Sequence, residues 1–304
     1  MSRPTRATPA GRAYLDLQNR ARREKRGTQE LLTLYVVERW LARLSVSAYA
    51  DQFVLKGGML LAAFDARRPT ADADTLARHI PHDEATLLAG VTAVAREPVA
   101  DDGVMFHTDT ASARTIRDEA LYSGLRITMT ATLATATVKF HLDVNFGDPI
   151  TPPPRRIRLP ALRADAEPIV IFGYPIETVL AEKITTAIAL GDANTRIRDY
   201  TDIYTLTGRH NVTRDTMRQA LLTTAEFRGT TLEPLSAVLD ELTDLRGATY
   251  TAYRTRLGTD GNHLPRSFAD VVTAVTTFTD PLTQPAATNP TWNATHRHWN
   301  GTSR

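Results

Sequence analysis

The stretch that determines the fold is FVLKGGMLLAAFDARRPTADADTLAR, residues Phe53–Arg78. Its pattern predicts a short apolar strand, a Gly-Gly turn, a helix, a Pro-Thr break and a second strand that carries Asp-x-Asp. Because side chains alternate between the two faces of a strand, Asp72 and Asp74 are expected on the same face, a few ångströms apart. Two carboxylates held that close repel each other unless a cation lies between them. The pair therefore predicts a divalent metal site.

The two glycines of this stretch predict a second part of the same site. Gly57 and Gly58 are expected to open the helix, where bare backbone N–H groups and the helix dipole can receive a phosphate. A metal pair beside a phosphate cradle is suited to nucleotidyl transfer. Each half also has an ordinary explanation, because Gly-Gly turns are common and Asp-x-Asp can form a turn at a strand end. The combination, with a third carboxylate further along the chain, favours the metal site.

Length and composition exclude several other classes of protein. A chain of 304 residues is long enough for two domains or one large one. No apolar run reaches the ~18 residues of a membrane span, and the N-terminal sequence lacks the apolar stretch of a secretory signal, so a cytoplasmic location is expected. The chain has no cysteine, which excludes disulfides, thiolate zinc sites and a Cys nucleophile. No GxxxxGK[ST] or GxSxG motif is present. The net charge of +2 permits nucleic-acid binding without requiring it.

A β-hairpin is predicted over 123–133 and 137–146, where Thr, Val, Ile and Phe alternate with polar residues. In its second strand the apolar residues point to one face, and Lys139 and Asp143 point to the other. Such a polar row is often simply exposed to solvent. Here Asp143 could join Asp72 and Asp74 as a third carboxylate.

Proline-rich residues 151–168 are expected to separate two domains. The first domain would span 1–160 and include the N-terminal helices; the second, over 161–280, would be helical and complete the active-site cleft. Residues 281–304, rich in Pro, Thr and Asn, are expected to form a flexible tail. The predicted helices of the second domain span 176–190, 198–207, 214–227, 235–257 and 266–278.

Lysine is rare in this arginine-rich chain and occurs only at positions 25, 56, 139 and 183. Lysine and arginine differ in reach and hydration, so a retained lysine can mark a functional position, although chance is an alternative with so few residues. Lys183 lies off the apolar face of its predicted helix and can enter a cleft. Arg196, Asp199 and Asp202 follow within one loop and helix start. An ordinary cluster of helix-capping and ion-pairing residues is the alternative reading of this group.

Three blocks of the sequence together resemble the AbiEii/AbiGii toxin family of nucleotidyltransferases. They are LKGGMLLAAF followed by RRPTADAD, FHLDVNFGDPI, and PIETVLAEKITTAIALGDANTRIRDYTDIYTL, and they cover roughly residues 50–208. The resemblance implies a DNA polymerase β-like fold of the α/β (α+β) class, with a mixed sheet and a mainly helical C-terminal domain. It also implies the toxin of a toxin–antitoxin or phage-defence system. Such a toxin would transfer NMP from NTP to RNA, with the 3′ ends of tRNA as the expected acceptor and Mg²⁺ or Mn²⁺ as the metal.

The family motifs carry over to individual residues of this chain. The catalytic residues implied are Lys56, Asp72, Asp74, Asp143, Lys183 and Asp202. The NTP-binding residues implied are Lys56, Gly57, Gly58, Lys183, Arg196 and Asp199, and the metal ligands are Asp72, Asp74 and Asp143. Two positions depart from the family pattern, with Ala71 in place of a basic residue and Thr75 in place of an aliphatic one. Both departures fall in the catalytic segment and could weaken activity or alter nucleotide preference.

In this scheme two metal ions neutralise charge during attack of a terminal hydroxyl on the α-phosphate. Asp143 would bind one of the ions and help to deprotonate the hydroxyl, and Lys56 or Lys183 would neutralise the triphosphate. The expected partners are an RNA acceptor, NTP and a cognate antitoxin, without a membrane. Two alternatives remain at this point. The acceptor could be a small molecule or a protein, or the chain could be a catalytically weak nucleotide- or RNA-binding module.

Overall fold

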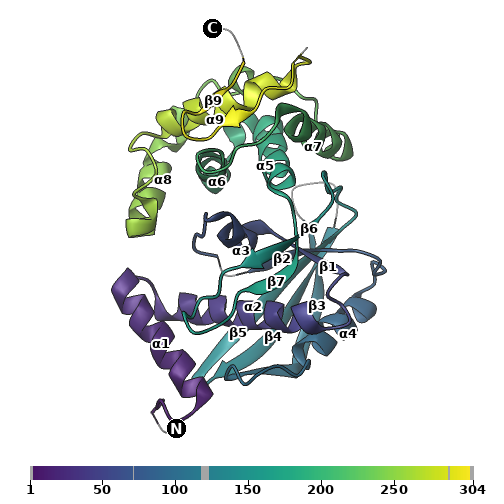
Figure 1. Cartoon of the computed structure of the whole chain (residues 1–304), viewed down its shortest axis with the longest axis vertical. Coiled ribbons are helices and arrows are strands. Elements are labelled where there is room, and N and C mark those ends of the chain that lie inside the picture. The colour runs from purple at the N-terminus through teal and green to yellow at the C-terminus, as the bar shows by residue number, and fades with distance from the viewer. Residues whose placement is uncertain (1–2, 71, 118–122, 287, 302–304) are drawn as a thin grey trace. The chain divides into compact units, whose positions relative to one another are not determined.

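The computed structural model describes residues 3–70, 72–117, 123–286 and 288–301 (Figure 1). The chain divides into two compact units. The first comprises residues 1–63, 67–147 and 155–173, and the second comprises 64–66, 148–154 and 174–304. The main division therefore follows residue 173 and not the expected residue 160. The reason is that two strands, one at 155–159 within the proline-rich segment and one at 169–173 after it, join the sheet of the first unit.

The first unit is built on a seven-stranded mixed sheet with the order β3-β4-β5-β2-β1-β7-β6. Its strands are β1 (Phe53–Lys56), β2 (Ala73–Ala77), β3 (Val104–Arg117), β4 (Ser123–Leu133), β5 (Ala136–Phe146), β6 (Arg155–Leu159) and β7 (Ile169–Gly173). β2 pairs with β5, and β1 with β7, in parallel, and the other neighbours are antiparallel. The predicted fold class is confirmed. The hairpin also forms within one residue of its predicted bounds.

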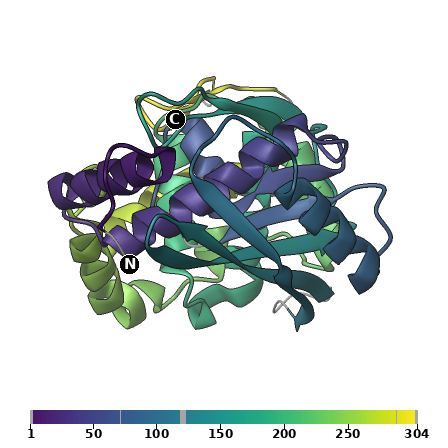
Figure 2. The ribbon, with the colours of Figure 1, turned by 90° about the horizontal axis from the view of Figure 1, so that it is seen from below.

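Helices cover the apolar face of this sheet. They are α1 (Pro9–Glu24), α2 (Thr28–Val46) and α4 (Glu84–Ala95), and α2 crosses the strands in Figures 1 and 2. The fully buried Trp40 of α2 packs against the rings of Phe53 and Phe140. This contact joins α2 to β1 and β5, so the apolar residues of β5 face the core as the alternating pattern predicts.

The Gly-Gly segment forms less helix than its sequence predicts. α3 is a single turn, Gly57–Leu60, and a 3₁₀ turn, Leu61–Phe64, follows it. β2 begins at Ala73, so Asp72 comes just before the strand and Asp74 lies within it. The register of β3 with β4 shifts between His107 and Ser112.

The second unit is mainly helical. Its helices are α5 (Ile176–Leu190), α6 (Ile197–Thr207), α7 (Arg214–Arg228), α8 (Leu242–Leu257) and α9 (Phe268–Thr283), with 3₁₀ turns at Gly191–Ala193, Leu235–Ala237 and Gly258–Gly261. α8 begins later than the predicted residue 235. The Asp192 carboxylate explains this start, because it accepts hydrogen bonds from the backbone N–H groups of Asp240, Glu241 and Leu242 and fixes the chain where the helix begins.

The C-terminal segment is packed where a flexible tail was expected. β8 (Trp292–Asn293) and β9 (His298–Trp299) form a short antiparallel hairpin. The rings of Trp292 and Trp299 contact each other and Phe278, and all three side chains are buried. The indole N–H of Trp292 donates to the carbonyl of Thr207 at 2.7 Å. Across the described residues, no helix has the length and apolarity needed to cross a bilayer.

Candidate active site

Strand pairing places four charged residues in one row across the first unit's sheet. Lys56 of β1 is opposite Asp74 of β2, Asp74 is opposite Asp143 of β5, and Asp143 is opposite Arg126 of β4. Residues in register point to the same face of a sheet, so the row reads cation, carboxylate, carboxylate, cation. Lys56 and Asp143 are buried, with 7% and 9% of their surface exposed. The predicted Lys56, Asp74 and Asp143 are thus brought together, and Asp72 precedes the same strand.

Gly57 and Gly58 leave room for the side chains around this row. Gly57 has φ +65°, and a Cβ atom there would collide with the Asp74 carboxylate. A Cβ atom on Gly58 would lie 2.7 Å from the hydroxyl oxygen of Thr70. Both positions therefore need glycine, the first for its backbone conformation as well as for space.

The environment of Asp74 favours a positive charge beside it. Asp74 is half-buried, and burial, together with the charges of Asp143 and Asp72, raises the pKa of its carboxyl to about 6. Lys56 and Arg68 act in the opposite direction and do not compensate fully. A carboxylate with an excess of nearby negative charge is the kind of group that a hard divalent cation stabilises. The Asp72–Asp74 pair therefore fits one such ion.

Asp143 has a different partner from the expected metal. The Arg126 guanidinium donates through Nε to one carboxylate oxygen of Asp143 and through Nη2 to the other, each at 2.6 Å. This two-point contact is the strongest geometry available to an Arg–carboxylate pair. In the described parts of the chain, no group of three or more His, Asp or Glu residues is arranged to hold a metal ion. The expected three-carboxylate cage is thus not formed in the structure.

The two departures from the family pattern have separate outcomes. Thr75 is fully buried on the opposite face of β2, and its hydroxyl lies 3.5 Å from the backbone carbonyl of Asp143. It therefore helps to join β2 to β5 and does not face the charged row. Ala71 lies outside the described residues.

The remaining predicted residues form a second cluster, on α5 and α6 of the second unit. The Lys183 ammonium lies 2.6 Å from a carboxylate oxygen of Asp199 and 2.8 Å from one of Asp202. Arg196 Nε donates to the other oxygen of Asp199 at 2.8 Å. Asp199 and Asp202 are 5% and 4% exposed, so these are buried ion pairs. These residues therefore form a cluster of ion pairs, as the alternative interpretation expected. The ion pairs hold the ammonium of Lys183 in one place.

Burial opposes ionisation of Asp199, but the charges of Lys183 and Arg196 outweigh it and lower the pKa of the carboxyl. Asp199 is therefore ionised at neutral pH. The position of the cluster follows from local sequence, because Lys183 lies off the apolar stripe of α5 and Asp199 lies in the first turn of α6.

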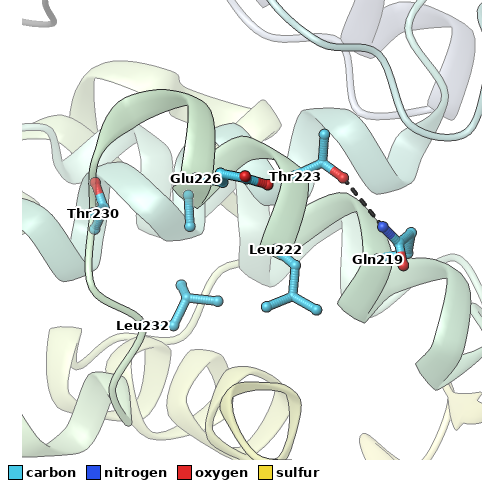
Figure 3. Close-up of a pocket in the computed structure, with 7 residues that line it drawn as sticks. Gln219, Leu222, Thr223, Glu226, Thr230 and Leu232 are labelled. Atoms are coloured by element: carbon cyan, nitrogen blue, oxygen red, sulfur yellow. Dashed lines mark hydrogen bonds between the residues drawn. The ribbon is translucent and has the colours of Figure 1, made fainter.

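Two residues of the first cluster were missed from the sequence. Arg126 is recognisable only through the hairpin register, and Arg68 only through its effect on the pKa of Asp74. A separate hollow of about 470 Å³ lies on the second unit along α7 (Figure 3). Its lining residues are Gln219, Leu222, Thr223, Ala225, Glu226, Thr230 and Leu232. It contains none of the predicted site residues and only one carboxylate.

Comparison with known families identifies the kind of protein to which this chain belongs. The family model described as "Nucleotidyl transferase AbiEii toxin, Type IV TA system" matches residues 39–274. The chain belongs to this AbiEii family. It is accordingly an NTP-dependent nucleotidyltransferase toxin, and the toxin–antitoxin system implies an antitoxin partner. No curated protein sequence matches this AbiEii chain.

Among the solved structures that resemble this AbiEii protein, MenT4 shares its fold. MenT4, a nucleotidyltransferase toxin from Mycobacterium tuberculosis H37Rv, has a TM-score of 0.54 and 15% identity, over 91% of this chain and 90% of that one. JHP933 from Helicobacter pylori matches with a TM-score of 0.40 and 13% identity, over 79% and 90% of the two chains. A putative nucleotidyltransferase from H. pylori matches with a TM-score of 0.33 and 12% identity, over 70% and 88%.

Proposed function

We propose that this toxin transfers NMP from NTP to RNA, at the 3′ ends of tRNA, in a metal-dependent reaction. The observation that carries the proposal is the charged row of the first unit, in which two carboxylates with too little neutralising charge lie beside the glycines of α3. A Mg²⁺ or Mn²⁺ ion bound by Asp72 and Asp74 would supply Lewis-acid stabilisation of the charge that develops on the α-phosphate.

The protein's own residues then position and neutralise the substrate. Lys56, next to Asp74 in the row, provides a buried positive charge for the triphosphate. Gly57 and Gly58 leave the backbone bare beside Asp74, which allows a phosphate to approach closely. In the second unit the ammonium of Lys183 is held in place by Asp199 and Asp202, which makes it a fixed cation suited to binding phosphate. Arg196 supports this cluster through Asp199.

The exposed charge of the first unit supports a polyanionic acceptor. α1 carries three exposed arginines, Arg12, Arg22 and Arg23, and Lys25 follows it at the C-terminal end. In contrast, Arg20 and Arg26 are neutralised by Glu24 and Glu30. Unneutralised arginines on one helix attract a phosphate backbone, in a manner that weakens as salt rises.

The test is transfer of label from each α-³²P-NTP to total tRNA in the presence of Mg²⁺ or Mn²⁺. Half of the tRNA is first oxidised with periodate, which destroys the 3′-terminal diol and leaves the remaining RNA intact. The proposal predicts label on untreated tRNA and none on oxidised tRNA. Equal labelling of both would place the acceptor elsewhere on the RNA. Label on protein or on a small molecule, with none on any RNA, would contradict the RNA acceptor.

A further inference from the structure

The contact between Arg126 and Asp143 is built into the sheet. The two residues are directly opposite each other on antiparallel β4 and β5, in a register that runs without interruption from Leu125 to Leu133. The pairing is therefore fixed by nine successive residue pairs and does not depend on the choice of one side-chain rotamer. A guanidinium in this position faces the carboxylate whenever the hairpin is folded.

The contact occupies both carboxylate oxygens of Asp143, which are the atoms that a metal ion would bind. Both carboxylate oxygens accept a hydrogen bond from Arg126, at 2.6 Å each. A guanidinium stays protonated at all ordinary pH values and presents its donors in a fixed fork that matches a carboxylate. A metal ion at Asp143 would have to lie close to this positive charge, and the two would repel each other.

Charged side chains of both signs surround the row. Three carboxylates, Asp72, Asp74 and Asp143, act on one another, and Lys56, Arg68 and Arg126 are the cations that act on them. Arg126 makes a two-point contact, and that contact is to Asp143.

We propose that Arg126 occupies the place of a second metal ion at Asp143, so that the chain binds one divalent cation, through Asp72 and Asp74. This inference rests on the proposed metal-dependent function. Arg126 is a positioning residue in this account, since it acts through Asp143. The protein would differ in this respect from a two-metal site in which all three carboxylates are ligands.

The experiment counts Mn²⁺ ions bound to the full chain, by EPR titration of free Mn²⁺ without nucleotide. Wild-type protein should bind one Mn²⁺. Asp74→Asn should weaken binding at least thirtyfold, whereas Asp143→Asn should change the affinity less than threefold. Arg126→Ala should free Asp143 and tighten binding about tenfold, and the double variant Arg126→Ala/Asp143→Asn should lose that gain. Arg126→Lys, which retains the charge, should behave like wild type.

The matched control is Arg114→Ala, because exposed Arg114 is opposite Arg126 on β3 and is an arginine of the same sheet. It should leave Mn²⁺ binding unchanged. Two equivalents of Mn²⁺ on wild type would overturn the proposal, as would loss of binding in Asp143→Asn equal to that in Asp74→Asn. The wild-type and Asp143→Asn titrations decide the matter even if Arg126→Ala does not fold. Nucleotide transfer is assayed on the same preparations, so one bound Mn²⁺ without transfer would contradict the proposed function alone.

Discussion

Individual residues of the charged row have narrowly defined surroundings. Gly57 adopts φ +65° and lies against Asp74, and Asp74 in turn is crowded by Asp143 on the neighbouring strand. A change at any of these positions affects the others through direct contact. The charged row is therefore sensitive to the addition of a single atom, such as a Cβ at Gly57.

Gly57→Ala should lower the free energy of unfolding by about 1–3 kcal/mol, because alanine is strained at this φ and its Cβ displaces the Asp74 carboxylate. Nucleotide transfer should fall by more than the loss of stability explains. Urea denaturation and transfer assays on the same protein measure the two effects. Gly247→Ala is the control, since Gly247 lies within α8 with no atom near its Cβ position. If Gly57→Ala were as active and stable as the control, the close packing of Asp74 would be refuted.

The acidic residues of the row were predictable from the sequence, and their basic partner was not. Asp72 and Asp74 follow a recognisable break, and Asp143 lies in an alternating strand. Finding Arg126 requires the exact hairpin register, which depends on the two-residue turn Ala134–Thr135. Ala134 has φ 52° there, although no glycine or asparagine marks the turn. The sequence therefore predicts the strands but leaves their alignment open.

At the scale of elements, α5 and α6 are joined by buried charges. Lys183 on α5 contacts both Asp199 and Asp202 on α6. Arg196 forms a further ion pair with Asp199. Removal of one member of such a cluster leaves uncompensated buried charge, which costs much more than the intact cluster contributes. A functional role for Lys183 must therefore be separated from this structural one.

Lys183→Met should destabilise the protein by about 3–5 kcal/mol, since two buried carboxylates lose their shared cation. The triple variant Lys183→Met/Asp199→Asn/Asp202→Asn removes the buried charges together and should recover most of that stability. Neither variant should transfer nucleotide, whereas wild type should. Recovery of transfer along with stability in the triple variant would show that Lys183 acts only in the fold. Chemical denaturation and the transfer assay provide the two readouts.

The C-terminal hairpin is the element that composition alone misrepresents. Its Pro, Thr and Asn content is typical of a flexible tail, yet Trp292 and Trp299 pack on Phe278 of α9. Two tryptophans that meet one helix supply enough apolar burial to order a short hairpin. The local sequence does not identify the helix that they contact, so the packing could not be predicted.

Trp292→Ala should lower the free energy of unfolding by about 3–5 kcal/mol, because the side chain is fully buried and its N–H group donates to Thr207. Leu245→Ala is the control, as Leu245 is 51% exposed on α8 and should change stability by less than about 0.5 kcal/mol. Equal melting temperatures for the two variants would contradict the packed hairpin.

At the scale of the whole molecule, the chain forms two units, each with its own apolar core and its own charged cluster. The order of a sheet unit followed by a helical unit was predictable from periodicity. The boundary was less so, because β6 lies within the proline-rich segment and β7 follows it, yet both belong to the sheet. β6 pairs with β7, and the pairing of β7 with β1 is a long-range contact that local patterns do not encode.

The lowered pKa of Asp199 predicts acid sensitivity of the second unit. A carboxyl whose folded-state pKa is below its unfolded value of about 3.9 contributes stability that is present above the unfolded value and is lost as the pH falls through the folded value. The urea concentration at the unfolding midpoint of the second unit should therefore decrease when the pH is lowered below about 4. The Asp199→Asn variant should be less stable than wild type at pH 7, and it should lose less stability when the pH is lowered. Fluorescence of a Trp40→Phe protein reports on this unit, since the other two tryptophans lie in it. An unchanged pH profile in Asp199→Asn would contradict the assignment.

The most direct test of the central claim is single-turnover transfer from α-³²P-NTP to tRNA by wild type, Asp74→Asn and Asp51→Asn at equal folded concentration. Asp51 is the matched carboxylate control, because its side chain is 77% exposed just before β1. The account predicts that Asp74→Asn lowers the transfer rate at least about 100-fold and that Asp51→Asn transfers like wild type. Transfer by Asp74→Asn at the wild-type rate would show that the charged row is not the active site.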